Sequence, residues 1–321
     1  MKKSMFLLGL AVAALASCTN EEVVNVTDQQ TGVISFAGSG LNNITKADMD
    51  GTTLTSFRVY GGYATNGSLF NGTTVSGSVG STWSYSPLQY WVDDENYKFA
   101  AYAPSDAATA SWDYTNGLTL TVTDAGSYDL VYDDATVNNV VASTQGAVSL
   151  TFGHLLSKVA FKFTLDNTLA GLDVTLQNLT IGNTIHDDGT WVAGQLQTLS
   201  GTGDASYTTL EAAAQVPAAT GLTTDAWYLI PQTVGAVSFS VAAVATDGVT
   251  TIKEGNITAT LPTNIISAWA GGNYYLYTAE LSIDNIVDPD EPDAETYPIQ
   301  FTVNSVTGYG DDPTEEEITF N

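Results

Sequence analysis

Apolar and polar residues alternate with a period of two along most of the chain. The alternation is clearest in segments of five to nine residues: 118–122, 148–152, 159–165, 237–241, 257–261 and 275–283. A period of two places successive side chains on opposite faces of a strand, so each segment predicts a strand with one buried face. The pattern as a whole predicts an all-β protein rich in antiparallel strands.

Turn signals separate these segments. Asn-Gly and Asp-Gly pairs supply the positive φ angles of tight hairpins, and they occur at 66–67, 71–72, 116–117, 188–189 and 247–248. Frequent hairpins of this kind are typical of β-sandwiches. The best helical candidate is 209–215, ended by Pro217, and it is too short to be stable without tertiary support.

The chain has 321 residues, which suggests two domains with additional terminal segments. The boundary is expected near Gly153, between the predicted strand ending at Phe152 and the long strand that follows. We therefore predict an N-terminal β-sandwich at 47–153, a C-terminal β-sandwich at 154–284 and a tail at 285–321.

The tail combines a charged linker with a strand pattern. Eleven acidic residues and no basic one lie between Asp284 and Asn321, so the linker repels itself. Ile299, Phe301 and Val303 then alternate with polar residues. An isolated strand is unstable in water, so this strand must pair with the edge of its own domain or with another molecule.

The N-terminus has the features of an export signal. Lys2 and Lys3 precede an apolar run at 5–16 that is too short to span a bilayer comfortably. The run ends in 15–18 (Leu-Ala-Ser-Cys), which resembles the bacterial lipobox, in which a lipid is attached to the cysteine. Residues 1–18 are therefore predicted to be a lipoprotein signal peptide with a lipidated Cys18; the alternative is an ordinary signal peptide with an incidental cysteine. Cys18 is the single cysteine, so no intramolecular disulfide can form.

Charge and residue types argue against several functions. The formal net charge is -27, which disfavours nucleic acid and anionic membrane surfaces as partners. His154 and His186 are the only histidines and have no second ligand at a suitable spacing, so neither a catalytic site, a metal site nor a cofactor is predicted. Acidic pairs at 93–94, 133–134, 187–188 and 311–312 are better interpreted as solvated turns. Most of the six tryptophans are expected in cores.

Several motifs, in order, resemble the fimbrillin family of type V pilus subunits from Bacteroidales bacteria. They are the lipobox and the segments 83–87 (Trp-Ser-Tyr-Ser-Pro), 90–91, 97–104, 152–159, 227–232 and 269–277. The resemblance runs from Cys18 to about Ile283. It implies two transthyretin-like β-sandwich domains.

The resemblance also implies a route of assembly. A lipidated precursor reaches the outer membrane, and a surface protease removes the tether and first strand at 19–46, cutting between Lys46 and Ala47. The groove left by Ile34 and Phe36 then receives the donor strand of a neighbouring subunit, here Ile299, Phe301, Val303 and Val306. The family usually has arginine at the processing site, and without a cut at Lys46 the protein would remain a lipidated anchor.

The two predicted strands could replace each other in one groove, since Ile34 and Phe36 share an Ile-x-Phe register with Ile299 and Phe301. We predict a structural, non-enzymatic pilus subunit of the cell-surface fimbrium that contributes to adhesion. Its expected partners are other fimbrial subunits, the surface protease, the outer-membrane lipid and a glycan or protein receptor on a host. The rival hypothesis is a surface-anchored lipoprotein that binds glycans as a monomer.

Overall fold

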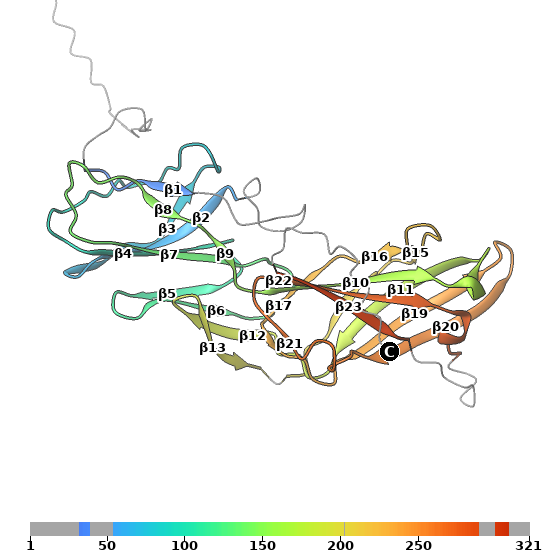
Figure 1. The fold of residues 1–321 in the computed structure, drawn as a ribbon. Helices are drawn as coiled ribbons and strands as arrows, with labels where there is room; N and C mark the ends of the chain where they lie inside the picture. The colour runs from blue at the N-terminus through green and yellow to red at the C-terminus, as the bar shows by residue number, and fades with distance from the viewer. Residues whose placement is uncertain (1–31, 39–53, 202, 289–298, 308–321) are drawn as a thin grey trace, which may run out of the picture.

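The computed structural model describes residues 32–38, 54–201, 203–288 and 299–307. Among them, the only helical elements are two single-turn 3-10 helices, η1 (Asn167–Leu169) and η2 (Ile283–Asn285). Figure 1 shows two β lobes arranged end to end. The predicted all-β sandwich architecture is confirmed.

The N-terminal lobe is built on a five-stranded antiparallel sheet in the order β3-β2-β4-β7-β9. Its strands are β2 (Ser56–Tyr63), β3 (Asn66–Ser76), β4 (Tyr97–Ala103), β7 (Val131–Val137) and β9 (Gly153–His154). The short parallel pair of β1 (Phe36–Gly38) and β8 (Val148–Leu150) packs on one face. This face supplies Phe57 and Phe99 to a core that also contains Phe36.

A four-stranded sheet in the order β13-β12-β6-β5 covers the opposite face. Its strands are β5 (Thr109–Asp113), β6 (Gly117–Val122), β12 (Asp188–Val192) and β13 (Gln195–Ser200). The hairpin of β12 and β13 comes from the second half of the chain, and Trp191 of β12 pairs with Leu120 of β6. A segment distant in sequence thus completes the first lobe.

The C-terminal lobe is a sandwich of two sheets. One has the order β16-β10-β22-β23, with β17 also paired to β10, and the other has the order β14-β11-β19-β20, with β15 also paired to β11. The first contains β10 (Ser157–Leu165), β16 (Leu222–Thr223), β17 (Trp227–Leu229), β22 (Asn273–Leu281) and β23 (Phe301–Thr307). The second contains β11 (Asp173–Gly182), β14 (Tyr207–Thr209), β15 (Ala214–Gln215), β19 (Ser238–Thr246) and β20 (Thr251–Thr260). A small pair, β18 (Gln232–Thr233) with β21 (Ala268–Trp269), flanks the sandwich.

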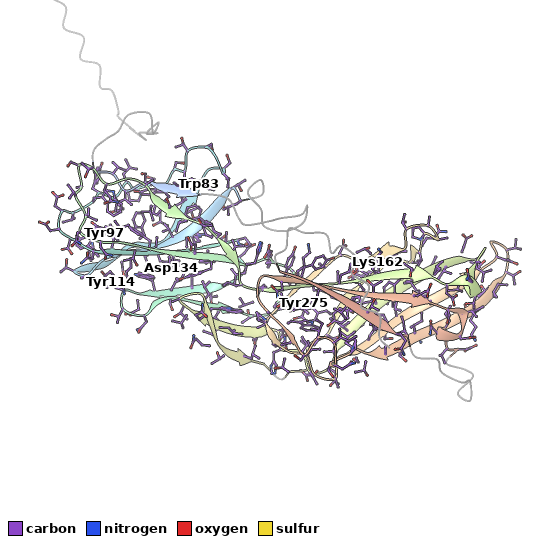
Figure 2. All side chains as sticks on the ribbon, in the orientation of Figure 1. Trp83, Tyr97, Tyr114, Asp134, Lys162 and Tyr275 are labelled. Carbon is purple, nitrogen blue, oxygen red and sulfur yellow. The ribbon has the colours of Figure 1, made fainter. Side chains whose placement is uncertain are left out.

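A shared core joins the two lobes. Strand β10 directs Phe161 into the C-terminal sandwich, while Ala160 faces a second cluster that includes Trp191 and Leu120 of the N-terminal lobe. Leu276 of β22 joins the same cluster. Figure 2 shows side chains, including the labelled aromatic residues, along both lobes. Because apolar contacts at the junction are buried, the lobes are expected to behave as one body.

Several local predictions are wrong. The expected turns at 66–67 and 71–72 both lie within β3, and the chain between β2 and β3 turns at 64–65 instead. The helical candidate 209–215 contains no helix; its ends pair instead with β11 through β14 and β15. The segment is long enough for only about two turns of helix, and it gains more from backbone pairing to an existing sheet. The expected turn at 188–189 is the start of β12, where a Cβ on Gly189 would lie 3.0 Å from the Trp191 ring.

Within the described parts of the chain, no helix has both the length and the apolar character needed to cross a membrane.

Candidate assembly site

The N-terminal segment 32–38 lies along the first lobe and is held mainly by backbone hydrogen bonds. The Ile34 amide donates to the Gln89 carbonyl at 2.9 Å, and the Trp91 amide donates to the Gly32 carbonyl at 2.7 Å. On the other side, the Val148 amide donates to the Ser35 carbonyl at 2.8 Å. The segment therefore sits between two parts of the same lobe and satisfies polar groups on both.

Phe36 fills an aromatic pocket. Its ring makes edge contacts with Phe57, Phe70, Tyr85 and Phe99 at centroid distances of 6.1, 5.5, 5.8 and 5.9 Å. Ile34 is 0% exposed and Phe36 is 5% exposed. Burial of such side chains contributes ~1.5–3 kcal/mol each, and edge-to-face aromatic pairs add to it.

Tyr85 fastens this segment to the loop before β4. Its hydroxyl donates to the Ile34 carbonyl at 2.6 Å and accepts from the Gln89 amide at 3.3 Å. Burial raises the pKa of Tyr85 to about 12, so the phenol stays protonated as a donor at neutral pH. We refer to Phe57, Phe70, Tyr85 and Phe99 as the Phe36 pocket.

The C-terminal strand β23 lies in its own lobe. It pairs antiparallel with β22, with Phe301 opposite Ala279 and Val306 opposite Tyr274. Ile299, Phe301 and Val303 are 6%, 7% and 4% exposed and belong to the core of the C-terminal sandwich. Of the two partners left open by the sequence, the structure thus has the strand on the edge of its own domain.

Phe301 has three aromatic neighbours there. Its ring lies 5.1 Å from Phe239, 5.9 Å from Phe161 and 6.1 Å from Tyr277, measured between centroids. A groove of about 490 Å³ remains beside Ile299 and Phe301, bounded by the end of β20 and the turn that follows it. Strand β23 thus covers this edge of the sandwich but leaves the groove beside it open.

Both terminal segments bury alternate apolar side chains, but their pairing differs: β1 lies parallel to β8 over three residues, and β23 lies antiparallel to β22 over seven. Strand β23 is the edge of its sheet, and β1 pairs only with β8 among the described strands. Each inserts an Ile and a Phe two residues apart into an aromatic core. The predicted residues Cys18, Lys46 and Ala47 lie outside the described residues. The Phe36 pocket and the clasp made by Tyr85 were missed by sequence reasoning, although Tyr85 lies within the motif at 83–87.

His154 and two of the acidic pairs make hydrogen bonds within the protein. Nδ1 of His154 lies 2.9 Å from Oδ1 of Asp129, and both side chains are buried where the chain passes between lobes. The Asp93 carboxylate accepts from the Ala142 amide, and that of Asp133 from the Thr151 amide. Among the residues with described side chains, no three His, Cys, Asp or Glu residues gather as a metal site would require.

The structure defines a class of protein: an elongated, two-lobed β-sandwich protein whose two terminal segments are each buried through alternate apolar side chains. The sequence profile of the fimbrillin-like family matches residues 41–291. The chain belongs to this family, and membership supports a fimbrial, adhesive role at the cell surface. Strands β1 and β23 lie outside the matched residues.

Solved structures show the same fold at low sequence identity. A fimbrial protein from Bacteroides vulgatus has a TM-score of 0.57 and 16% identity, covering 87% of this chain and 99% of its own. A putative cell adhesion protein from Bacteroides ovatus has a TM-score of 0.57 and 15% identity with the same coverage. One from Bacteroides uniformis has a TM-score of 0.53 and 17% identity, again covering 87% and 99%. No curated protein sequence matches the chain.

Proposed function

We propose that the protein is a structural subunit of a type V pilus, exported as a lipoprotein, matured by proteolysis and polymerised by strand exchange. The observation that carries the proposal is that both terminal segments bury an Ile and a Phe two residues apart. Ile34 and Phe36 lie in the core of one lobe, and Ile299 and Phe301 lie in the core of the other with the same spacing. A strand that fits one groove can therefore fit the other in a second copy.

Proteolysis at Lys46 would release the segment that carries Ile34 and Phe36. The chain would keep the Phe36 pocket but lose the strand that covers it, along with the backbone partners of Gln89 and Val148. Uncovered edge groups and apolar surface favour the addition of another strand. The incoming strand from a neighbouring subunit restores both kinds of contact.

The two grooves differ in how they hold their aromatic side chain. Phe36 has four aromatic neighbours and is clasped by Tyr85, whereas Phe301 has three and leaves a groove of about 490 Å³ beside it. Better packing stabilises the same side chain more. In an empty Phe36 pocket, β23 would gain aromatic contacts and the Tyr85 donor in exchange for its seven residue pairs with β22, so the exchange requires that β1 has left the pocket.

The linker gives β23 a long reach. Residues between Val287, which pairs with Asn256, and Ile299 can span up to roughly 40 Å when extended, at about 3.3–3.6 Å per residue. Such an exchange runs head to tail and does not close on itself, so it builds filaments. The lipid on Cys18 holds the precursor at the outer membrane until maturation, after which the subunit joins the fimbrium.

The rival hypothesis, a monomeric glycan binder, expects a cluster of exposed aromatic side chains. Among the described residues, the large exposed aromatics are Tyr90 and Tyr128, which lie in different loops. This arrangement favours the pilus subunit.

The proposal is tested on protein recovered from sheared cell surfaces and from outer membranes. N-terminal sequencing and intact mass should give a start at Ala47 in the sheared fraction and a lipidated Cys18 in the membrane fraction. If all surface protein begins at Cys18 and no ladder of polymers appears on mildly denaturing gels, the protein is an anchor or a membrane-bound monomer, and strand exchange is rejected.

A further inference from the structure

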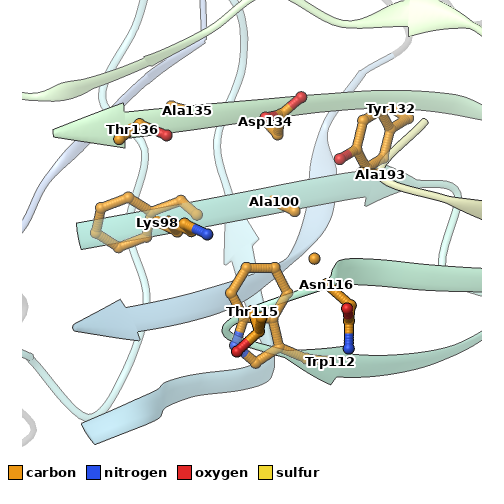
Figure 3. Close-up of a pocket in the computed structure, with 12 residues that line it drawn as sticks. Lys98, Ala100, Trp112, Thr115, Asn116, Tyr132, Asp134, Ala135, Thr136 and Ala193 are labelled. Atoms are coloured by element: carbon orange, nitrogen blue, oxygen red, sulfur yellow. The ribbon is translucent and has the colours of Figure 1, made fainter. Parts of the chain in front are cut away.

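The N-terminal lobe has a second concave feature, on the face of its central sheet opposite β1. A cleft of about 230 Å³ lies between β4 and β7 on one side and the hairpin of β5 and β6 on the other. Figure 3 shows its lining, with Ala100 on β4, Asp134 and Thr136 on β7, and Trp112 and Asn116 on the hairpin. We refer to it as the Trp112 cleft.

The cleft exists because small residues meet at this point. Ala100 pairs with Asp134 across the sheet, and Gly117 and Ala193 lie above it from β6 and the β12–β13 turn. A Cβ on Gly117 would lie 3.2 Å from that of Ala193, so these two backbones are already close. Packed sheets lie ~10 Å apart, a distance that small side chains cannot fill.

Contacts within the lobe hold the walls in place. The Trp112 indole nitrogen donates to the Gly67 carbonyl at 2.5 Å, which fixes the ring that forms one wall. The Lys98 ammonium donates to the Tyr114 carbonyl at 3.1 Å and lies 5.1 Å from the centre of the Tyr114 ring. The Asp113 carboxylate accepts from the Asn116 amide at 2.8 Å and orders the hairpin turn. These contacts preorganise the cleft and lower the cost of binding.

The inner end of the cleft carries a buried phenol. Tyr132 is 8% exposed, and its hydroxyl makes no hydrogen bond of good geometry to a described residue. Burial, followed by the neighbouring carboxylates of Asp134 and Asp133, raises the pKa of Tyr132, so it remains a donor. A buried donor without a partner costs ~1–3 kcal/mol. The exposed Asp134 carboxylate lies next to this phenol, and both side chains line the cleft.

The chemistry of the lining selects a neutral, hydroxyl-rich ring. The formal charges of Lys98 and Asp134 in the lining cancel, and the protein's net charge of -27 disfavours the binding of an anion. An indole offers an apolar face, while a carboxylate, an amide and the threonine hydroxyls at its edge can bond to hydroxyl groups. The volume lies below the ~300–1,000 Å³ of sites for drug-sized ligands, so it suits one ring.

We propose that the Trp112 cleft binds a single pyranose unit of a neutral glycan. Trp112 provides the stacking face, and Asp134 and Asn116 are the hydrogen-bond partners of the sugar hydroxyls. The cleft and β1 lie on opposite faces of one sheet, since Phe99 faces Phe36 while Ala100 faces the cleft. Loss or replacement of β1 therefore leaves the cleft open.

If the subunits polymerise as proposed above, every subunit of the fibre carries this site. One small cleft gives weak binding, on the order of a millimolar Kd, which corresponds to about -4 kcal/mol. Many copies along one fibre raise the overall affinity without any new contact. Weak single sites are thus sufficient for adhesion.

The test uses saturation-transfer NMR on the native protein purified from the cell surface. The probes are the methyl glycosides of glucose, mannose, galactose and N-acetylglucosamine, with glucuronate as an anion of the same ring size. At least one neutral glycoside should receive saturation with a millimolar Kd, and glucuronate should bind at least ~tenfold more weakly.

Variants localise the site. Thr136→Phe fills the cleft from an exposed position and should abolish transfer, while Asp134→Asn, which keeps the shape, should weaken binding by ~tenfold. Tyr90→Ala removes an exposed aromatic elsewhere and should leave binding unchanged, with thermal melting used to verify that each variant is folded. The inference is overturned if no neutral glycoside binds, or if binding survives both cleft variants. Either result leaves polymerisation untouched, because polymers are measured separately on gels.

Discussion

The Tyr85 hydroxyl donates to the Ile34 carbonyl at 2.6 Å, joining residues 51 positions apart. This bond ties the first described segment of the chain to the loop before β4, and it does so within the pocket that holds Phe36. The donor thus belongs to the groove and not to the N-terminal segment. The Tyr85 hydroxyl would remain after the segment is removed, and it could donate to a carbonyl of another strand bound in the same position.

Replacing Tyr85 with Phe tests the clasp. The variant keeps the ring contact with Phe36 but leaves the Ile34 carbonyl without this donor, which should lower the free energy of unfolding by roughly 1–2 kcal/mol. The melting temperature should fall by a few degrees. Tyr90→Phe is the matched control, because Tyr90 is 53% exposed and should tolerate the change. Equal melting temperatures for all three proteins would contradict the role of the bond.

Buried tyrosines predict sensitivity to alkali. Burial is the first cause of raised pKa values in Tyr85 and Tyr102, both of which reach about 12. The same direction applies to Tyr60, Tyr97, Tyr132, Tyr207 and Tyr277. Unfolded tyrosines ionise near pH 10. Stability should therefore be fully present below pH 10 and be lost as the pH rises through about 12.

Urea unfolding at pH 8, 10, 11 and 12 measures this loss, with the tyrosinate absorbance recorded in parallel. Ionisation and unfolding should coincide above pH 10. A protein whose tyrosines all ionise near pH 10 while it remains folded would contradict the assigned burial.

The core shared by the two lobes predicts cooperative unfolding. Trp191 is 2% exposed and packs from β12 into a cluster that contains Leu120 of the first lobe and Leu276 of the second. Trp191→Ala should cost ~3–5 kcal/mol and separate one calorimetric transition into two. Leu199→Ala on β13 is the control, since Leu199 is 39% exposed. A single transition in Trp191→Ala would show that the lobes are coupled by other contacts.

Much of this fold follows from local pattern. Apolar and polar residues alternate along strand β10 because Phe161 and Phe163 face one core while Lys162 does not. Successive side chains of a strand point to opposite faces, so this burial appears in the sequence as a period of two. The same reasoning applies to Ile299 and Phe301, whose alternation predicts a buried face. These features depend on neighbours along the chain, so the sequence alone reveals them.

Other features depend on contacts between distant segments. Gly189 resembles a turn residue, yet it lies in β12, where the close approach of Trp191 and Ile230 leaves little room for a side chain. The Trp112 cleft has the same origin, since Ala100 and Ala193, far apart in sequence, set the space between two sheets. The sequence does not distinguish the half-buried Trp112 from the other tryptophans for this reason. No local period encodes such distances.

The C-terminal strand supplies a prediction that separates stability from assembly. Phe301→Ala should destabilise the C-terminal lobe by ~3–5 kcal/mol and reduce polymer yield, because the donor strand loses its largest anchor. Gln300→Ala alters the exposed residue just before β23 and should affect neither. Polymers are measured on gels after mild denaturation, at a temperature where the folded fraction of each variant is known. Undiminished polymers in Phe301→Ala would reject β23 as the donor.

Processing at Lys46 is the step on which strand exchange depends. Lys46→Gln removes the positive charge that a trypsin-like protease requires, so the surface protein should keep its lipidated Cys18 start and form no polymers. Lys46→Arg preserves the charge and should yield a start at residue 47, as Lys46 itself should. Lys253→Gln, on strand β20, controls for loss of a lysine elsewhere. Intact mass distinguishes these outcomes directly. If Lys46→Gln still matures and polymerises, the cut lies at another residue, and the groove must be opened by a different event.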